Sequence, residues 1–318
     1  MPTDDELTAP IASRERALRP ASPPAQKAPV VKQSYEASAD VRRWLQEQAL
    51  DASGKPPFEP SLLAGRRDRD WILSSLTHFY ERDLITDVLQ EVSSGKEATV
   101  YRCAANPATG VASLAAKVYR PRMFRSLRND AVYRESRAQY DRDGRPVRDK
   151  GRHGRDGAKT TRGRAAQVTN WIDYEFATHQ LLHEAGADVP RPLAQSGNAV
   201  LMEYIGDDDG PAPLLYEVRL SPAEARPLFD RLLHNIELWL SCDRIHGDLS
   251  AYNILYRPGM VTIIDFAQAL DPRHNPAVYP LFERDVERVC RYFARYGIAA
   301  DPGALASEIW LRQQGGLF

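Results

Sequence analysis

Four short segments of this chain have the apolar pattern of β-strands. Residues 85–102 alternate between apolar and polar positions and are interrupted at Ser93–Glu97, so we expect two strands joined by a loop there. Residues 114–119 form the next predicted strand. A continuous apolar run at 199–205 predicts a buried strand. These segments indicate a small sheet.

Other apolar positions repeat at helical spacing. Ser221 is placed to cap a long helix that runs to Ser241, and Glu224 occupies the position that completes a capping box. The remaining predicted helices cover 71–84, 171–185, 281–296 and 302–312. Because the strands come first and most helices later, the sequence predicts an α+β protein with a small antiparallel sheet in an N-terminal lobe and helices in a C-terminal lobe.

The sequence divides into three parts. Residues 1–65 are rich in proline, alanine, serine and charge, and we expect a largely disordered tail with one short helix possible at 40–50. Residues 66–205 would hold a helix and the sheet-rich lobe, and 206–318 the helical lobe.

Within the second part, 120–165 carries fifteen Arg or Lys residues against six acidic ones, punctuated by glycines. We expect this basic insert to be flexible, either as a solvated loop or as a loop that orders on nucleotide, on a protein substrate or on RNA phosphates, with the ribosome or RNA as the partner.

Composition excludes several other classes of protein. The 318 residues carry a formal net charge of −1, which gives no global preference for nucleic acid. The three cysteines are far apart and form no CxxC pair, so neither a zinc site nor a disulfide framework is predicted. The sequence starts with acidic residues rather than a secretory signal, and no apolar run is long enough to cross a membrane. We therefore expect a cytoplasmic protein with no membrane partner.

One stretch near residue 250 carries the most specific chemical signal. Asp248 is followed five residues later by Asn253, and Asp265 ends an apolar strand. Phosphoryl transfer from a nucleotide needs a carboxylate that orients the attacking hydroxyl, and an amide with a second carboxylate that hold Mg²⁺. Strands at 254–256 and 261–264, joined by a Pro-Gly turn, would place Asn253 and Asp265 side by side. The protein is therefore predicted to use ATP.

A lysine and a glutamate are predicted to anchor the nucleotide phosphates. Lys117 lies in the strand Ala-Ala-Lys-Val-Tyr, where its apolar neighbours argue against a solvent-facing side chain. A kinase holds such a lysine on the α and β phosphates through a glutamate of a helix, and Glu175 is the best candidate. Asp173 is the fallback, but it lies two positions away on the helix and should face elsewhere.

The interrupted strand pair supplies a candidate phosphate-covering loop. Ser94, Gly95 and Lys96 lie in the loop, and Val100 lies on the strand that follows. The loop has one glycine, so it fails the GxGxxG pattern, and its Gly-Lys pair is followed by Glu, which excludes a Walker A loop. Its position upstream of Lys117 is what indicates nucleotide binding.

The adenine is expected where the strand at 199–205 joins the helical lobe. Met202 lies in this strand, and the backbone C=O and N–H groups of Glu203 and Ile205 would pair with the base. Leu255 and Ile264 would form an apolar floor, although both would serve equally well as ordinary core.

Taken together, these motifs resemble the RIO family of atypical kinases, most closely its type-one branch. The resemblance covers about residues 85–300 and rests on Ser94–Tyr101, Trp171–Phe176, Leu201–Gly206, His246–Tyr256, Ile264–Gln268 and Arg284–Val289. It implies a two-lobed fold similar to that of protein kinases. The long basic insert after Arg120 departs from the archaeal and eukaryotic members, and we expect a bacterial one.

The resemblance also implies roles for individual residues. Asp248 would be the catalytic acid-base residue, Asn253 and Asp265 the metal ligands, and Lys117 a phosphate-binding residue. RIO proteins are associated with an aspartyl-phosphate on the metal-binding aspartate, which here is Asp265. The implied cofactors are ATP and Mg²⁺, with Mn²⁺ as a substitute. The implied activity is that of a serine/threonine kinase acting on a protein acceptor or on itself.

Two alternatives stay open. Small-molecule phosphotransferases of the aminoglycoside or choline kinase type share a His-Gly-Asp-x-x-x-x-Asn stretch, but they build their acceptor pocket from helices flanking and following the metal-binding aspartate. Only 53 residues follow Asp265 here. An ATPase that times ribosome assembly would use the same residues as a kinase. Gly247 stands where ordinary protein kinases have an arginine, and no Ala-Pro-Glu follows Asp265, so no usual activation segment is predicted.

Overall fold

The computed structural model describes residues 55–120, 161–274 and 278–315. The protein separates into two units, Met1–Gln33 and Ser34–Phe318, and every described residue belongs to the second. The short helix expected at 40–50 and most of the basic insert lie outside the described residues. No helix in the described ranges is long and apolar enough to cross a membrane.

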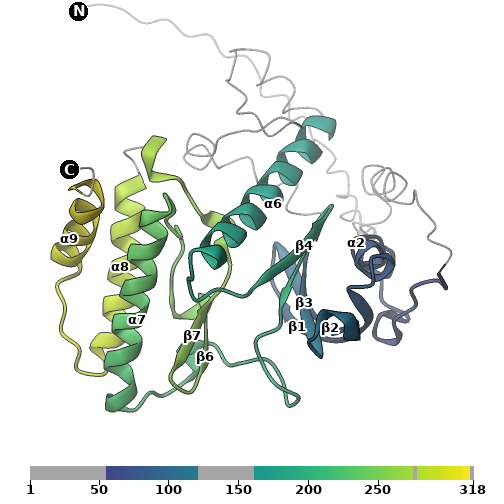
Figure 1. Ribbon diagram of the computed structural model, residues 1–318, viewed down its shortest axis with the longest axis horizontal. Helices are drawn as coiled ribbons and strands as arrows, with labels where there is room; N and C mark the ends of the chain where they lie inside the picture. The colour runs from purple at the N-terminus through teal and green to yellow at the C-terminus, as the bar shows by residue number, and fades with distance from the viewer. Residues whose placement is uncertain (1–54, 121–160, 275–277, 316–318) are drawn as a thin grey trace, which may run out of the picture. The chain divides into compact units, whose positions relative to one another are not determined.

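The N-terminal lobe is a five-stranded antiparallel sheet with the strand order β1-β2-β3-β5-β4 (Figure 1). Its elements are α2 (Arg69–Glu81), β1 (Ile85–Ser94), β2 (Ala98–Ala105), β3 (Ser113–Tyr119), α6 (Thr161–Glu184), β4 (Pro192–Ser196) and β5 (Ala199–Glu203). The expected strands are confirmed. The edge strand β4 was not predicted, because its five residues are mostly half-buried and show no apolar alternation.

The two faces of the sheet are covered by different helices. Even-numbered residues of β3, from Leu114 to Val118, belong to an apolar cluster that includes α2. The odd-numbered Ala115 and Tyr119 belong to a second cluster, which includes residues of α6. Since side chains alternate along a strand, Lys117 faces the α6 side of the sheet.

Two boundaries differ from the sequence prediction by more than three residues. Helix α6 begins at Thr161, ten residues earlier than expected, so the last residues of the predicted insert are helical. Phe58 and Leu63 were assigned to the disordered tail, but both are buried in the cluster that contains α2. These two apolar residues stand among prolines with no period, and only the α2 surface that they cover gives them a place in the fold.

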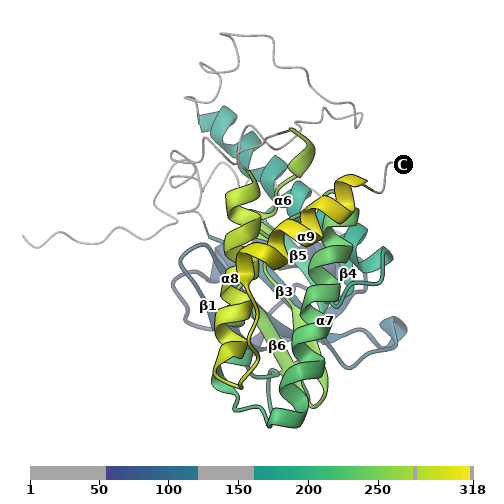
Figure 2. The same ribbon diagram turned by 90° about the vertical axis from the view of Figure 1, so that its left-hand side faces the viewer.

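The C-terminal lobe is mainly helical (Figures 1 and 2). Its elements are α7 (Pro222–Ser241), β6 (Ile254–Arg257), β7 (Met260–Ile263), α8 (Tyr279–Ala294) and α9 (Pro302–Gly315). The predicted capping box is present: Ser221 Oγ accepts from Glu224 N at 3.3 Å, and the Glu224 carboxylate accepts from Ser221 N at 3.1 Å. Helices α7, α8 and α9 lie side by side around one apolar core, in which Leu232, Val286 and Phe293 are fully buried.

Candidate active site

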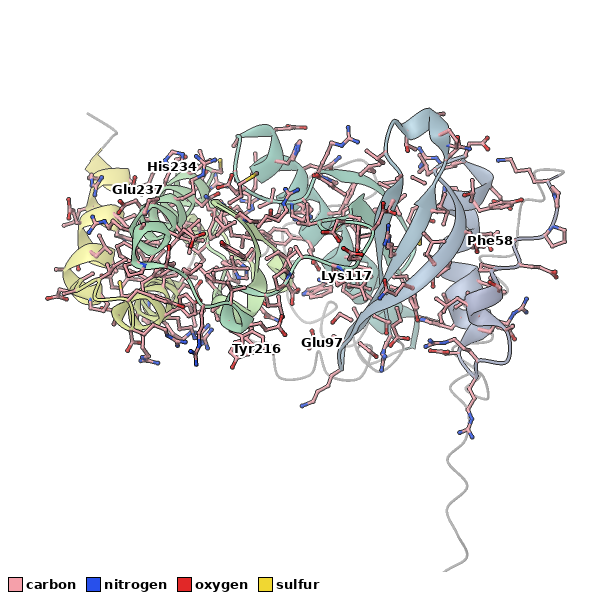
Figure 3. The ribbon with its side chains drawn as sticks, turned by 90° about the horizontal axis from the view of Figure 1, so that it is seen from below. Phe58, Glu97, Lys117, Tyr216, His234 and Glu237 are labelled. Carbon is pink, nitrogen blue, oxygen red and sulfur yellow. The ribbon has the colours of Figure 1, made fainter. Side chains whose placement is uncertain are left out.

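Lys117 joins the two lobes through two carboxylates. Figure 3 shows it where the sheet-rich half meets the helical half. Its Nζ lies 2.7 Å from Glu175 Oε1 on α6 and 2.8 Å from Asp265 Oδ1 after β7. Burial works to lower the pKa of Lys117, but Asp265 and Glu175 together raise it well above its usual value. The lysine is therefore charged, and it lies next to two of the predicted site carboxylates, Glu175 and Asp265.

Glu175 is fixed by a second partner that the sequence did not reveal. The hydroxyl of Tyr119 donates a short hydrogen bond to Glu175 Oε2, while Lys117 occupies Oε1. Glu175 is only 6% exposed, so both carboxylate oxygens need such donors. Tyr119 lies two residues after Lys117 on the same face of β3. This spacing is the sequence feature that could have predicted its place beside Lys117. The fallback residue Asp173 is exposed and takes no part.

Asp265 has an uncommon backbone conformation. Its φ of 70° and ψ of 66° lie in the left-handed region, which only two other non-glycine residues of the described ranges share. Its carboxylate is 46% exposed, and the charge of Lys117 lowers its pKa below the usual value. Backbone strain of this kind collects at functional sites. Asp265 thus presents an ionised carboxylate at the junction of the lobes.

The β6–β7 hairpin brings Asn253, the predicted amide ligand, close to Asp265. Ile254 pairs with Ile263, and Ile264 N donates to Asn253 O at 2.9 Å, so Asn253 lies opposite the residue that precedes Asp265. Asn253 Nδ2 donates to the backbone oxygen of Asp248 at 3.0 Å. This bond leaves the amide oxygen of Asn253 available as a ligand.

The donor set suits a magnesium ion that completes its shell elsewhere. Mg²⁺ prefers carboxylate and carbonyl oxygens, and it usually binds one or two protein ligands plus phosphates and water. Asn253 and Asp265 supply an amide oxygen and a carboxylate of this kind. No group of three His, Cys, Asp or Glu side chains within the described ranges forms a self-sufficient metal site. The residues present therefore fit Mg²⁺ that arrives with a nucleotide.

Asp248 stands on a tight turn that helix α8 holds. Gly247 has a φ of 77°, and a Cβ there would lie 2.3 Å from Gln268 O, so only glycine fits. Asp285 of α8 accepts from Gly247 N at 2.7 Å and from Leu249 N at 3.0 Å. The Asp248 carboxylate, flanked by these two anchored residues, is 52% exposed. The turn presents it toward solvent on a rigid support.

Asp285 is a positioning residue that the sequence reasoning did not assign. It is 3% exposed, and burial raises its pKa to about 7. The two N–H groups favour the charged form and lower the pKa, but the effect of burial is larger. Its position in the sequence could have revealed it, because Asp285 is an aspartate on the same helix as Val286 and Val289, which belong to the core.

His246 connects the segments that carry Asp248 and Asp265. Its Nε2 lies 3.2 Å from the backbone oxygen of Ile264, and its ring packs 4.7 Å from that of Phe266. Burial lowers the pKa of His246, so the ring is neutral at physiological pH. This histidine ties the turn that carries Asp248 to the strand end that carries Asp265.

The predicted phosphate-covering residues lie at the end of the β1–β2 hairpin, which Figure 3 marks by Glu97. Ser94, Gly95 and Lys96 are all exposed, and the backbone hydrogen bond from Gly95 N to Ala98 O closes the turn at 2.9 Å. Val100 is half-buried and pairs with Lys117 in the β2–β3 register. The hairpin therefore leads directly to the strand pair that contains Lys117.

The predicted adenine residues lie along the end of β5 and the segment that follows. Met202 and Ile205 are buried. Glu203 N donates to Arg191 O, and Ile205 O accepts from Ala212 N at 3.0 Å, so these two groups are already paired. A base would have to use the Glu203 carbonyl and the Ile205 N–H instead.

Leu255 and Ile264, the predicted apolar floor, are both half-buried. In the β6–β7 register they share a face with Asn253, opposite the buried Ile254 and Ile263. An apolar floor under a nucleotide would have to lie on this face if Asn253 is the predicted metal ligand.

A comparison with known protein families decides the relationship. The model of the RIO domain matches residues 100–304, which is more than half of the sequence. The chain belongs to the RIO family. The match contains Lys117, Glu175, Asp248 and Asp265.

Curated relatives carry kinase names. The chain is 32% identical over 220 residues to the "RIO-type serine/threonine-protein kinase Rio1" of Haloferax volcanii, covering 67% of this chain and 66% of that one. It is 28% identical over 272 residues to the "Serine/threonine-protein kinase RIO1" of Homo sapiens, covering 85% of this chain and 42% of that one. The chain thus spans less than half of its human relative and about two thirds of the archaeal one.

Solved structures show the same fold. The Rio2 kinase of Chaetomium thermophilum superimposes with a TM-score of 0.54 at 21% identity, over 86% of this chain and 85% of that one. A second structure of this kinase, an ADP/Mg²⁺-phosphoaspartate complex, gives a TM-score of 0.52 at 22% identity, over 75% and 65% of the two chains. The expected two-lobed kinase-like fold is confirmed.

Proposed function

We propose that this protein is an ATP-dependent RIO-type serine/threonine kinase that transfers the γ-phosphoryl group of Mg²⁺-ATP to a protein acceptor or to itself. The observation that carries the proposal is the contact of Lys117 with both Glu175 and Asp265. The contact supports the proposal because it brings together the three residues that would serve as phosphate-binding lysine, its helix partner and metal-binding aspartate in phosphoryl transfer.

Each residue of the site has a defined task in this proposal. Lys117 binds the α and β phosphates while Glu175 holds its side chain. Asn253 and Asp265 would hold Mg²⁺, and the ion would neutralise the charge that develops on the phosphates. Asp248 orients the acceptor hydroxyl and receives its proton as the new bond to phosphorus forms. The bond between the γ-phosphorus and the ADP oxygen breaks in the same reaction.

The helices after Asp265 favour this function over small-molecule phosphotransfer. Helix α8 buries Val286, Val289 and Phe293 in the core, and α9 buries Ile309 in the same cluster. These helices support the lobe, and the polar side of α8 holds the catalytic turn. The buried residues of both helices are thus engaged in packing, and Asp285 of α8 supports the turn.

We further propose Asp265 as a site of aspartyl-phosphate formation. The Chaetomium thermophilum Rio2 structure is described as a phosphoaspartate complex. In the present protein Asp265 has an ionised, 46% exposed carboxylate beside Lys117, which suits attack on the γ-phosphorus. Hydrolysis of such an intermediate would yield net ATPase activity from the same residues.

The test is incubation with γ-labelled ATP and Mg²⁺, alone and with ribosomal fractions, choline or an aminoglycoside. Label on serine or threonine is the expected result. Hydroxylamine-sensitive label that disappears in Asp265→Asn would support the aspartyl-phosphate. Free phosphate alone would favour the ATPase, and label on a small molecule would overturn the proposal.

Asp248→Ala provides the matching mutational test. It should lower phosphoryl transfer by roughly 10²- to 10⁴-fold, the usual contribution of a general base, while calorimetry shows near-normal ATP binding. Asp230→Ala removes an exposed aspartate of α7 that pairs with Arg226, and it serves as the control. Near-normal turnover of Asp248→Ala would contradict the assigned role.

A further inference from the structure

The described part of helix α8 sends three charged side chains to the catalytic turn, and each makes a different contact. Arg284 Nη2 donates to Gly247 O, and Asp285 accepts from Gly247 N and Leu249 N. Both of these contacts are to the backbone. Arg288, one helical turn later, instead donates from Nη1 to the carboxylate oxygen Oδ1 of Asp248 at 2.7 Å. It alone among the three touches the side chain that is proposed to react.

We infer that Arg288 is a positioning residue for Asp248: it fixes one carboxylate oxygen so that the other points toward the acceptor hydroxyl. This inference rests on the proposed function. The Asp248 side chain is 52% exposed, and a carboxylate surrounded by water can rotate among several orientations. A charge-assisted hydrogen bond from an arginine selects one of them. No donor of the described ranges is bonded to Oδ2, which stays available to a hydroxyl.

The pair is poorly suited to a purely structural role. Arg288 is 32% exposed and Asp248 52%, and ion pairs this open to water contribute little to folding stability. The turn already has its backbone support from Asp285. What Arg288 adds is orientation of the reacting group, and orientation affects rate far more than stability.

The geometry also favours arginine over lysine. Arg288 Nη1 makes both contacts, 2.7 Å to Asp248 Oδ1 and 3.5 Å to Leu249 O. The planar guanidinium fixes the directions of the two N–H groups on this nitrogen, whereas a lysine ammonium rotates freely about its terminal bond. A lysine would keep the charge but lose this constraint. Arg288→Lys should therefore recover only part of the function.

The experiment measures ATP turnover, as label on protein plus free phosphate, in the intact protein. Arg288→Ala should lower kcat by about 10- to 100-fold and leave the KM for ATP within about twofold, because positioning errors of this kind affect the chemical step. Arg288→Lys should lie between Arg288→Ala and the wild type. Arg291→Ala is the control, since Arg291 lies on the same helix, is 70% exposed and pairs with Glu287. Its kcat should stay within about twofold of the wild type.

Measuring Arg288→Ala in a protein that also carries Asp248→Asn separates positioning from a general structural effect. If Arg288 acts through the Asp248 carboxylate, Arg288→Ala should cost nothing further in an Asp248→Asn protein measured by single-turnover labelling. An unchanged kcat for Arg288→Ala, an equal loss in Arg291→Ala, or a second full loss in the Asp248→Asn background would each overturn the inference. Normal turnover of Asp248→Asn itself would refute the proposed function instead, and the inference with it.

Discussion

The catalytic turn and the β1–β2 hairpin face the same nucleotide in the proposed site, yet they are built in opposite ways. The turn at Gly247–Leu249 is held by a buried carboxylate of α8 and by a glycine that no other residue can replace. The hairpin residues Ser93–Glu97 are all exposed, and the backbone hydrogen bond between Gly95 and Ala98 closes their turn.

This difference indicates where each step of the reaction needs precision. In the proposed mechanism the turn carries the carboxylate that meets the acceptor hydroxyl, and small errors in its position would lower the rate strongly. The hairpin would cover phosphates that arrive and leave in each cycle, so it benefits from freedom to move. Changes in the turn should therefore reduce folding and chemistry, whereas changes in the hairpin should affect nucleotide binding alone.

A matched pair of glycine substitutions should show the largest contrast. Gly247→Ala forces a left-handed φ of 77° on alanine and puts its Cβ 2.3 Å from Gln268 O, so we expect a loss of about 2–4 kcal/mol in unfolding free energy and no turnover. Gly95→Ala has no positive φ, and its Cβ would lie 3.4 Å from Ala98 O. Urea unfolding should find it within about 0.5 kcal/mol of the wild type. Equal stability of the two variants would contradict the contrast.

Asp285 should make the stability of the turn depend on pH. Its pKa is raised from 3.8 to about 7 by burial. Between about pH 4 and 7 the folded protein keeps a proton that the unfolded protein has lost, so the unfolding free energy falls as pH rises, by at most about 1.4 kcal/mol per pH unit. Asp285→Asn cannot ionise and should remove this slope.

Denaturant unfolding of the two proteins at several pH values measures this difference. Asp230→Asn, which changes an exposed aspartate of α7, should keep the slope of the wild type. If Asp285→Asn retains it as well, another group is responsible for the pH dependence.

Sequence reasoning found the chemistry better than the supports. Asp248, Asn253 and Asp265 have spacing that only a few reactions require, so their types were sufficient to propose roles. Tyr119 and Asp285 act through burial and direction, which depend on segments about 40 to 60 residues away in the sequence. Likewise, nothing in the residues around Asp265 indicates its left-handed backbone, because the surrounding fold imposes it.

Tyr119 and Tyr101 offer a smaller test on two faces of one sheet. Both are buried, but the Tyr119 hydroxyl donates to Glu175, whereas the Tyr101 hydroxyl has no hydrogen-bond partner within the described residues. Tyr119→Phe leaves a buried carboxylate oxygen unsatisfied and should cost about 1–3 kcal/mol of stability, with weaker ATP binding. Tyr101→Phe should be neutral or slightly stabilising. Thermal unfolding and calorimetry with ATP measure both effects; equal losses would mean that the bond to Glu175 contributes nothing.

The smallest effect is expected at the tip of the hairpin. Lys96 is exposed, so Lys96→Ala should change unfolding free energy by less than about 0.5 kcal/mol. If the hairpin closes over the phosphates, the lost cation should raise the KM for ATP by a few fold at low salt and leave kcat unchanged. High salt should remove most of that difference, because exposed charges are screened within about 10 Å at 0.1 M ionic strength. A fall in kcat with normal KM would instead place Lys96 in the chemical step. It would contradict the assignment of nucleotide binding to the hairpin and of chemistry to the turn.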